Sequence, residues 1–170
     1  MDGYWILLGM MGAGKSTVGR ALSALLEVPF QDTDNLLERR FGRQVAAIFK
    51  IYGEEAYRGH ETSVIEALHR QPGVLATGGG LVMREQNWEQ FRRLGRTVFL
   101  DVPPEQLKDR LSRSKKRRPL LEHEDWRERF DVLYSTRLPL YARADIRFPV
   151  DAEHLETCAQ LLFERIQEEK

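Results

Sequence analysis

The feature that most constrains this chain is a glycine-rich segment near its start, GMMGAGKS at residues 9–16. The segment fits the phosphate-binding loop pattern G-x-x-x-x-G-K-[ST] without a mismatch, so an ordinary tight turn is the weaker interpretation. Residues 4–8 predict a short buried strand before it, and residues 17–26 predict an amphipathic helix after it. The glycines of such a loop let backbone N–H groups converge on phosphate oxygens, and the start of the helix adds positive potential. We expect Lys15 to reach the outer phosphates of a nucleotide and the Ser16 hydroxyl to hold Mg²⁺.

Composition favours an ordinary globular protein. The chain has 170 residues, which suits one domain over residues 1–170. Its 26 basic and 26 acidic residues give a formal net charge of zero, which argues against a general nucleic-acid binder. It has no apolar run of membrane-spanning length and no pattern of a signal peptide, so we expect a cytoplasmic protein without a membrane partner. Nothing in the sequence requires a second chain, and we expect a monomer.

Cysteine and histidine offer little chemistry. The single cysteine, Cys158, excludes an internal disulfide and suits a reducing compartment, and we expect it to be a small buried residue of the last helix. The four histidines fit no metal-ligand or catalytic-triad spacing, so we expect them to be structural or on the surface. They are His60, His69, His123 and His154.

Strands and helices alternate along the whole chain. We predict strands at residues 4–8, 29–32, 74–77, 97–102 and 146–150, each followed by a helix, with helices at residues 54–70 and 152–167 among them. This order is typical of a three-layer α/β fold, in which helices cover both faces of a five-stranded parallel sheet. Ligands of such sheets bind beyond the carboxyl ends of the strands, where the phosphate loop would lie.

Two aspartates, Asp32 and Asp34, end the second predicted strand. Because side chains alternate along a strand, we expect both carboxylates on one side of the chain, near the bound triphosphate. One would hold a metal-bound water, and the other would accept a proton from an attacking hydroxyl. The competing interpretation is helix capping, for which Asn35 and Glu38 could form a capping pair. Spacing alone favours neither.

Three consecutive glycines, Gly78, Gly79 and Gly80, follow the third predicted strand. Glycine permits a close approach of backbone to ligand. A plain flexible turn is at least as good an interpretation of the triplet by itself.

Arg58 and Glu61 lie three residues apart on the predicted helix before that strand, so Glu61 can orient the guanidinium. An ion pair on the surface is the usual explanation of this spacing. Phe49 and Tyr57 are nearby aromatic residues that either belong to the core or form an apolar floor for a small ring.

Two arginine-containing segments follow in the second half of the chain. A basic run at residues 113–118 precedes Pro119, and it fits either a solvated loop or a lid over the nucleotide at about residues 112–123. An arginine of such a mobile lid would offset charge on the transferring phosphoryl group. Arg137 stands before Pro139, which we expect to interrupt a helix, and it faces either a cleft or solvent.

Taken in order, these segments closely resemble the shikimate kinase family. The matching patterns are G-x-x-G-x-G-K-S-T at Gly9–Thr17, D-T-D at Asp32–Asp34, I-F-x-x-x-G-E at Ile48–Glu54, an aromatic-R-x-x-E at Tyr57–Glu61, G-G-G at Gly78–Gly80, R-P-L-L at Arg118–Leu121 and R-x-P-L-Y at Arg137–Tyr141. They span nearly the whole chain. The resemblance implies a P-loop NTPase fold and transfer of a phosphoryl group from ATP to the 3-hydroxyl of shikimate, a step of aromatic amino-acid synthesis.

The resemblance also implies roles for individual residues. ATP would be bound by Gly12, Ala13, Gly14, Lys15, Ser16, Thr17, Arg110 and Arg118; Mg²⁺ by Ser16 and Asp32; and shikimate by Asp34, Arg58, Gly78, Gly79, Gly80 and Arg137. Lys15, Asp34 and Arg118 would be catalytic, with Asp34 as the base. Arg58 and Arg137 would clamp the shikimate carboxylate, a geometry that suits guanidinium groups. Either Arg110 or Arg113 would meet the adenine.

Three other functions compete with this one. A gluconate kinase or a nucleoside monophosphate kinase shares the fold but lacks this combination of D-T-D, R-P-L-L and R-x-P-L-Y. A regulatory GTPase would need an N-K-x-D segment, which does not occur. A non-catalytic shikimate-kinase-like binding protein is disfavoured by the intact Lys15, Ser16, Asp34 and Arg118.

Overall fold

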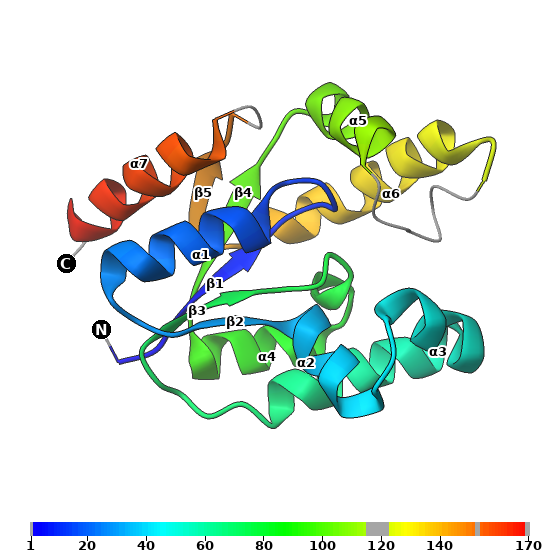
Figure 1. Ribbon diagram of the computed structural model, residues 1–170, viewed down its shortest axis with the longest axis horizontal. Helices are drawn as coiled ribbons and strands as arrows, with labels where there is room; N and C mark the ends of the chain where they lie inside the picture. Colours follow the sequence, from blue (N-terminus) through cyan, green and yellow to red (C-terminus); the bar gives the residue numbers. More distant parts are fainter. Residues whose placement is uncertain (1, 115–122, 152–153, 169–170) are drawn as a thin grey trace.

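A five-stranded parallel sheet forms the centre of the computed structural model, which describes residues 2–114, 123–151 and 154–168 (Figure 1). The strand order is β2-β3-β1-β4-β5, and every pair of neighbours is parallel. The strands are β1 (Tyr4–Leu8), β2 (Phe30–Asp32), β3 (Gly73–Ala76), β4 (Gly95–Asp101) and β5 (Ile146–Pro149). The predicted fold class is therefore confirmed, and each predicted strand lies within two residues of its observed bounds.

Helices cover both faces of the sheet. They are α1 (Lys15–Leu26), α2 (Thr33–Phe41), α3 (Val45–Glu66), α4 (Glu85–Leu94), α5 (Pro104–Arg113), α6 (Trp126–Tyr141) and α7 (Leu155–Glu168), with a short 3-10 helix, η1 (Leu81–Met83). Helices α1 and α7 pack side by side on one face, and α4 lies against β4 on the other (Figure 1). All five residues of β1 are buried, because this central strand is covered on both sides.

The carboxyl ends of β1, β2 and β3 point to one side of the molecule. There, α2 and α3 form one wall and α5 and α6 form the other (Figure 1). The loop after β1 leads into α1, and Gly78–Gly80 follow β3. The two glycine-rich segments therefore meet at the edge of the sheet where ligands bind in folds of this kind.

Several predicted boundaries were wrong for identifiable reasons. Helix α3 runs from Val45 to Glu66 across a kink at Gly53, whose φ is 77°, so the predicted start at residue 54 matches the part after the kink and only the predicted end at residue 70 is too late. The helix predicted from residue 152 begins at Leu155. Pro139 does not interrupt α6, which continues to Tyr141. Proline removes one N–H from the helix, and the carbonyl left without that donor belongs to exposed Ser135, which water can reach.

Asp34 does not extend the second strand. β2 ends at Asp32, and α2 begins at Thr33, so Asp34 lies in the first turn of a helix. The Asp32 carboxylate accepts a hydrogen bond from the Asp34 backbone N–H at 2.9 Å, which makes Asp32 the N-cap. The predicted capping pair of Asn35 and Glu38 was wrong, since Glu38 instead accepts from the backbone N–H of Val45 at 3.0 Å.

Among the helices of the described ranges, none is long and apolar enough to span a membrane.

Candidate active site

The phosphate loop joins β1 to α1 and has the backbone that its glycines allow. Gly12 and Gly14 both have φ of 87°, in the left-handed region. The Lys15 ammonium turns back over the loop and donates to the carbonyl oxygens of Gly9, at 2.8 Å, and Met10, at 2.9 Å. The predicted ATP-binding residues 12–17 thus run from the loop into the first turn of α1.

Helix α5 packs against this loop. A Cβ atom added to Gly12 would lie 3.4 Å from Leu111 Cγ, so a side chain there would press on α5. Arg110, the residue before Leu111, is half-buried on the same helix. The predicted adenine contact therefore comes from an element that lies against the phosphate loop.

Ser16 and Asp32 form a pair of oxygen ligands beside the loop. The Ser16 hydroxyl donates to Asp32 Oδ2 at 2.7 Å, while Oδ1 of the same carboxylate caps α2. Hydroxyl and carboxylate oxygens are the ligands that Mg²⁺ prefers, and Mg²⁺ sites commonly use few protein ligands beside phosphates and water. The donor set therefore fits the predicted metal. Of the two functions that the sequence left as alternatives, the structure confirms that Asp32 caps a helix, and its second oxygen pairs with Ser16, where the metal role stays a prediction.

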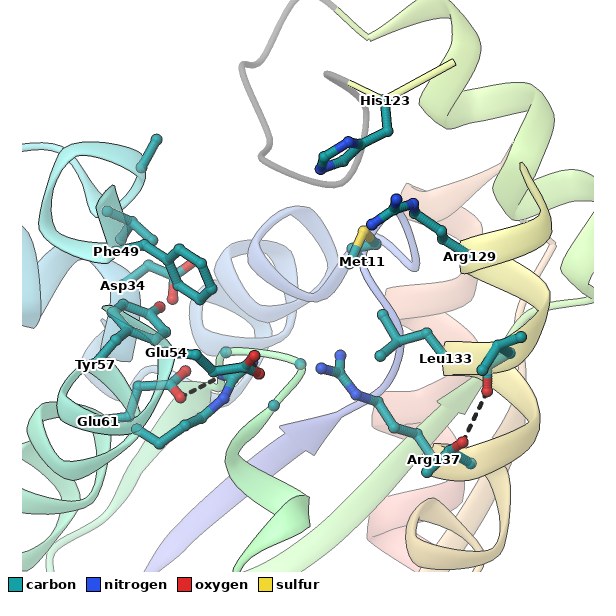
Figure 2. Close-up of a pocket in the computed structure, with 18 of the residues that line it drawn as sticks. Met11, Asp34, Phe49, Glu54, Tyr57, Glu61, His123, Arg129, Leu133 and Arg137 are labelled. Carbon is teal, nitrogen blue, oxygen red and sulfur yellow. Dashed lines mark hydrogen bonds and ion pairs between the residues drawn. The ribbon is translucent and has the colours of Figure 1, made fainter. Parts of the chain in front are cut away.

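A cavity of about 1130 Å³ opens beside the loop, between α2 and α3 on one side and α6 on the other (Figure 2). Every residue predicted to bind the acceptor substrate lines it, namely Asp34, Arg58, Gly78, Gly79, Gly80 and Arg137. Met11 of the phosphate loop also lines it. The structure thus gathers these residues from five separate segments of the chain around one space.

The glycine triplet fits closely against the charged residues of this cavity. A Cβ on Gly78 would lie 2.6 Å from Glu61 Oε1, and one on Gly80 would lie 2.0 Å from Arg58 Nη1. A Cβ on Gly79 would lie 3.4 Å from Arg137 Nη1. A side chain at Gly78 or Gly80 would therefore displace a charged group, which explains the triplet better than a flexible turn does.

Arg58 is held by the carboxylate that the sequence assigned to it. Its Nη1 donates to Glu61 Oε2 at 2.6 Å, and its Nη2 lies 3.4 Å from Glu54 Oε1. Burial alone would lower the pKa of Arg58, but Glu61, Tyr57 and Glu54 together outweigh burial and raise it. Burial raises the pKa of Glu61, which is 1% exposed, and Arg58 opposes that rise. The pair is therefore buried and not the surface ion pair that the spacing commonly signifies.

Arg137 reaches into the cavity from α6, opposite Asp34 and Glu61 (Figure 2). It is 5% exposed, and within the described part of the chain it makes no ion pair and its Nε has no hydrogen-bond partner. Burial lowers the pKa of its guanidinium, and the positive charge of Arg58 lowers it further. The charge of Arg58 thus disfavours the charged form of Arg137, and Arg137 has no ion pair with a carboxylate among the described residues. An anion in the cavity would stabilise both positive charges.

Aromatic side chains form the apolar part of the same wall. The rings of Phe49 and Tyr57 pack edge to face with centroids 5.4 Å apart, and both line the cavity (Figure 2). Burial of Tyr57 and the charge of Glu61 raise the pKa of its phenol, so the hydroxyl stays neutral. Tyr57 also belongs to a buried cluster with Leu37 and Ile48, against which Phe49 packs, so the core interpretation of these residues is confirmed and the floor for a bound ring stays a prediction.

Sequence reasoning missed most of the α6 wall. Arg129 and Leu133 line the cavity from α6, because their spacing with Arg137 places all three on one side of the helix. His123, expected to be structural or on the surface, also lines the cavity and points toward it (Figure 2). The spacing of four residues between Arg129, Leu133 and Arg137 is visible in the sequence. It does not indicate a binding site by itself, because the sequence does not show which segments lie opposite this side of the helix.

The predicted lid is only partly described. It was placed at about residues 112–123, but residues 112 and 113 still belong to α5. Arg118 lies outside the described residues. Arg113 pairs with Asp109 one turn earlier on α5.

Comparison with known proteins gives one consistent family. A family model described as "Shikimate kinase" matches residues 11–167. A curated shikimate kinase from Symbiobacterium thermophilum is 42% identical over 96% of this chain and 95% of its own length. A solved shikimate kinase from Acinetobacter baumannii, in complex with shikimate, is 35% identical with a TM-score of 0.92, covering 100% of this chain and 96% of that one.

More distant structures share the fold alone. A gluconokinase from Sinorhizobium meliloti is 20% identical with a TM-score of 0.58, covering 99% of this chain and 95% of that one. At this identity the likeness carries no information about the acceptor.

Proposed function

The chain belongs to the shikimate kinase family, and on that premise we propose that it transfers the terminal phosphoryl group of ATP to the 3-hydroxyl of shikimate. The products are ADP and shikimate 3-phosphate. The choice of acceptor rests on the environment of Arg137, whose buried guanidinium has no ion pair among the described residues. Arg137 and Arg58 line the same cavity, which Asp34 also lines. A small acid with a hydroxyl group satisfies all three residues.

The two arginines bind the carboxylate of the acceptor. Arg58 is held by Glu61 at 2.6 Å, so its guanidinium is oriented before the substrate arrives. Arg137 gains the counter-ion that it lacks, and charge-assisted hydrogen bonds of this kind are among the strong ones. The ring of the acceptor then lies between the glycine triplet and the Phe49–Tyr57 floor.

Lys15 and the phosphate loop hold ATP, with the Lys15 ammonium moving from its own loop carbonyls to the outer phosphates. Ser16 and Asp32 hold Mg²⁺, which neutralises part of the phosphate charge when it is bound. Arg118 offsets charge on the transferring group, and Arg110 of α5 meets the base.

Asp34 accepts the proton of the attacking hydroxyl. It lines the cavity, and its oxygen Oδ1 would lie 3.1 Å from a Cβ on Gly78, so it borders the space where the acceptor lies. Little covalent chemistry is required of the protein, and most of the rate enhancement comes from positioning and charge. Nothing in the sequence requires a second chain, so we propose a monomer, and ATP as co-substrate suits a cytoplasmic enzyme.

A coupled assay for ADP release tests this function. Purified protein with Mg-ATP is measured alone and with shikimate, gluconate or a nucleoside monophosphate. We expect release that depends on shikimate alone. Release with gluconate or the nucleotide instead would assign another acceptor, and ATP binding without any turnover would favour a non-catalytic binding protein.

A further inference from the structure

Tyr141, the last residue of α6, lies where the acceptor cavity meets the phosphate loop. Its hydroxyl donates to the carbonyl oxygen of Gly79 at 2.6 Å and lies 3.8 Å from Met10 Sδ. A Cβ built on Gly79 would lie 3.4 Å from this hydroxyl and also 3.4 Å from Nη1 of Arg137, so the phenol and the guanidinium border the same glycine. One phenolic oxygen thus lies beside an acceptor-binding arginine, the glycine triplet and the phosphate loop.

The position of this hydroxyl is fixed by packing. Tyr141 is 1% exposed, and its ring stacks on Phe99 of β4 with centroids 5.2 Å apart and an angle of 12° between the planes. Burial raises the pKa of the phenol to about 12, so it keeps its proton and remains a donor to Gly79 at neutral pH. The central sheet therefore determines where the hydroxyl lies, and the hydroxyl holds its two partners.

We propose that Tyr141 is a positioning residue, whose hydroxyl holds the Arg137 guanidinium and the Gly79 carbonyl in the arrangement that receives the acceptor carboxylate. Arg137 and Gly79 line the cavity, and Tyr141 lies buried behind them. A buried guanidinium without an ion pair among the described residues needs neighbouring groups to fix its direction, and the Tyr141 hydroxyl lies beside the same glycine as its Nη1. The inference rests on the proposed function, since it assigns Tyr141 to acceptor binding.

The test compares Tyr141→Phe with Tyr4→Phe, a matched control. Tyr4 is also 1% exposed, and its hydroxyl donates to Gln31 at 3.1 Å and accepts from Gln71 at 2.6 Å. It lies at the start of β1, at the opposite end of the strand from the phosphate loop. Each variant removes one buried hydroxyl with two hydrogen bonds, so a loss of stability alone affects both.

We expect Tyr141→Phe to raise the KM for shikimate about 10-fold and to leave the KM for ATP within about twofold of the wild type. Tyr4→Phe should change neither constant, although both variants should unfold at a lower temperature than the wild type. The same effect on shikimate in both variants, or none in Tyr141→Phe, would overturn the positioning role.

A double-mutant cycle with Arg137→Ala identifies the route. If the hydroxyl acts through Arg137, adding Tyr141→Phe to Arg137→Ala should change the KM for shikimate less than twofold further. A further change of about 10-fold would refute action through Arg137. A wild-type enzyme without shikimate-dependent ADP release would overturn both the function and this inference, whereas an active wild type with an unaffected Tyr141→Phe overturns the inference alone.

Discussion

A Cβ atom built on Gly80 would lie 2.0 Å from Nη1 of Arg58, so the guanidinium occupies the space that any side chain at residue 80 would need. The backbone of Gly80 is ordinary, with φ of −92° and ψ of −11°, which alanine adopts without strain. The glycine is therefore required by the position of Arg58 and not by its own conformation.

Gly80→Ala should consequently impair acceptor binding with little loss of stability. The arginine is a flexible side chain that can move away, but it then leaves its 2.6 Å bond to Glu61. We expect the KM for shikimate to rise about 10-fold or more. Steady-state kinetics test this against Gly59→Ala, which adds a Cβ in open space one residue from Arg58 on the same helix. The control should be fully active, and an equally active Gly80→Ala would contradict the steric argument.

Arg58→Ala should affect both binding and folding. Removing the guanidinium weakens the grip on the acceptor carboxylate and leaves the buried Glu61 carboxylate without its ion pair, which costs about 3 kcal/mol of unfolding free energy. The double variant Arg58→Ala with Glu61→Gln should recover much of that stability but not the KM for shikimate. An unchanged KM in Arg58→Ala would remove Arg58 from the proposed clamp.

The stability deficit of Arg58→Ala should depend on pH. Burial already raises the pKa of Glu61, and removing Arg58 removes the charge that opposes this rise. A carboxyl with a higher pKa in the folded protein binds its proton more tightly there, so stability falls as the pH rises through that pKa. Urea unfolding should therefore give a larger deficit at pH 8 than at pH 5.5. In the double variant with Glu61→Gln this increase of the deficit with pH should be absent, and a deficit in the single variant that does not grow with pH would argue against this cause.

The parts of this fold that sequence predicts well are those that depend on neighbouring residues. The strand, loop and helix around Lys15 follow from local pattern, and so does the pairing of Arg58 with Glu61, since three residues place both on one side of a helix. Part of the chemistry of the cavity was predictable to the same extent, because Asp34, Arg58 and Arg137 each lie in a short motif.

What sequence did not reveal depends on packing between distant segments. The strand order β2-β3-β1-β4-β5 and the α6 wall with Arg129 and Leu133 have no local signature. Asp34 was assigned to a strand because alternation continues through it, whereas the Asp32 cap starts a helix there. Burial distinguishes the Arg58–Glu61 pair from a surface ion pair, and burial is a property of the assembled fold.

Lys15→Ala should reduce turnover far more than stability. The ammonium makes two hydrogen bonds to loop carbonyls, each contributing about 1 kcal/mol, so the cost in folding is small. Loss of a charge that stabilises the transition state lowers kcat by about 100- to 1000-fold. The exposed Lys50 on α3 provides a matched control, and Lys50→Ala should keep wild-type kcat. Near-normal turnover in Lys15→Ala would contradict its role at the phosphates.

Asp32 performs two functions that different substitutions separate. Its Oδ1 caps α2, and its Oδ2 accepts from the Ser16 hydroxyl at 2.7 Å. Asp32→Ala loses both, and the missing cap alone costs about 1 kcal/mol. Serine is an equally good cap without a carboxylate, so Asp32→Ser should unfold near the wild-type temperature yet need several-fold more Mg²⁺ for half-maximal activity.

Titrating Mg²⁺ in the ADP-release assay at saturating ATP measures the Mg²⁺ requirement of Asp32→Ser. Asp34→Asn is the comparison, because it should lower kcat with an unchanged Mg²⁺ requirement. If Asp32→Ser keeps the wild-type Mg²⁺ dependence, then Asp32 is a helix cap alone.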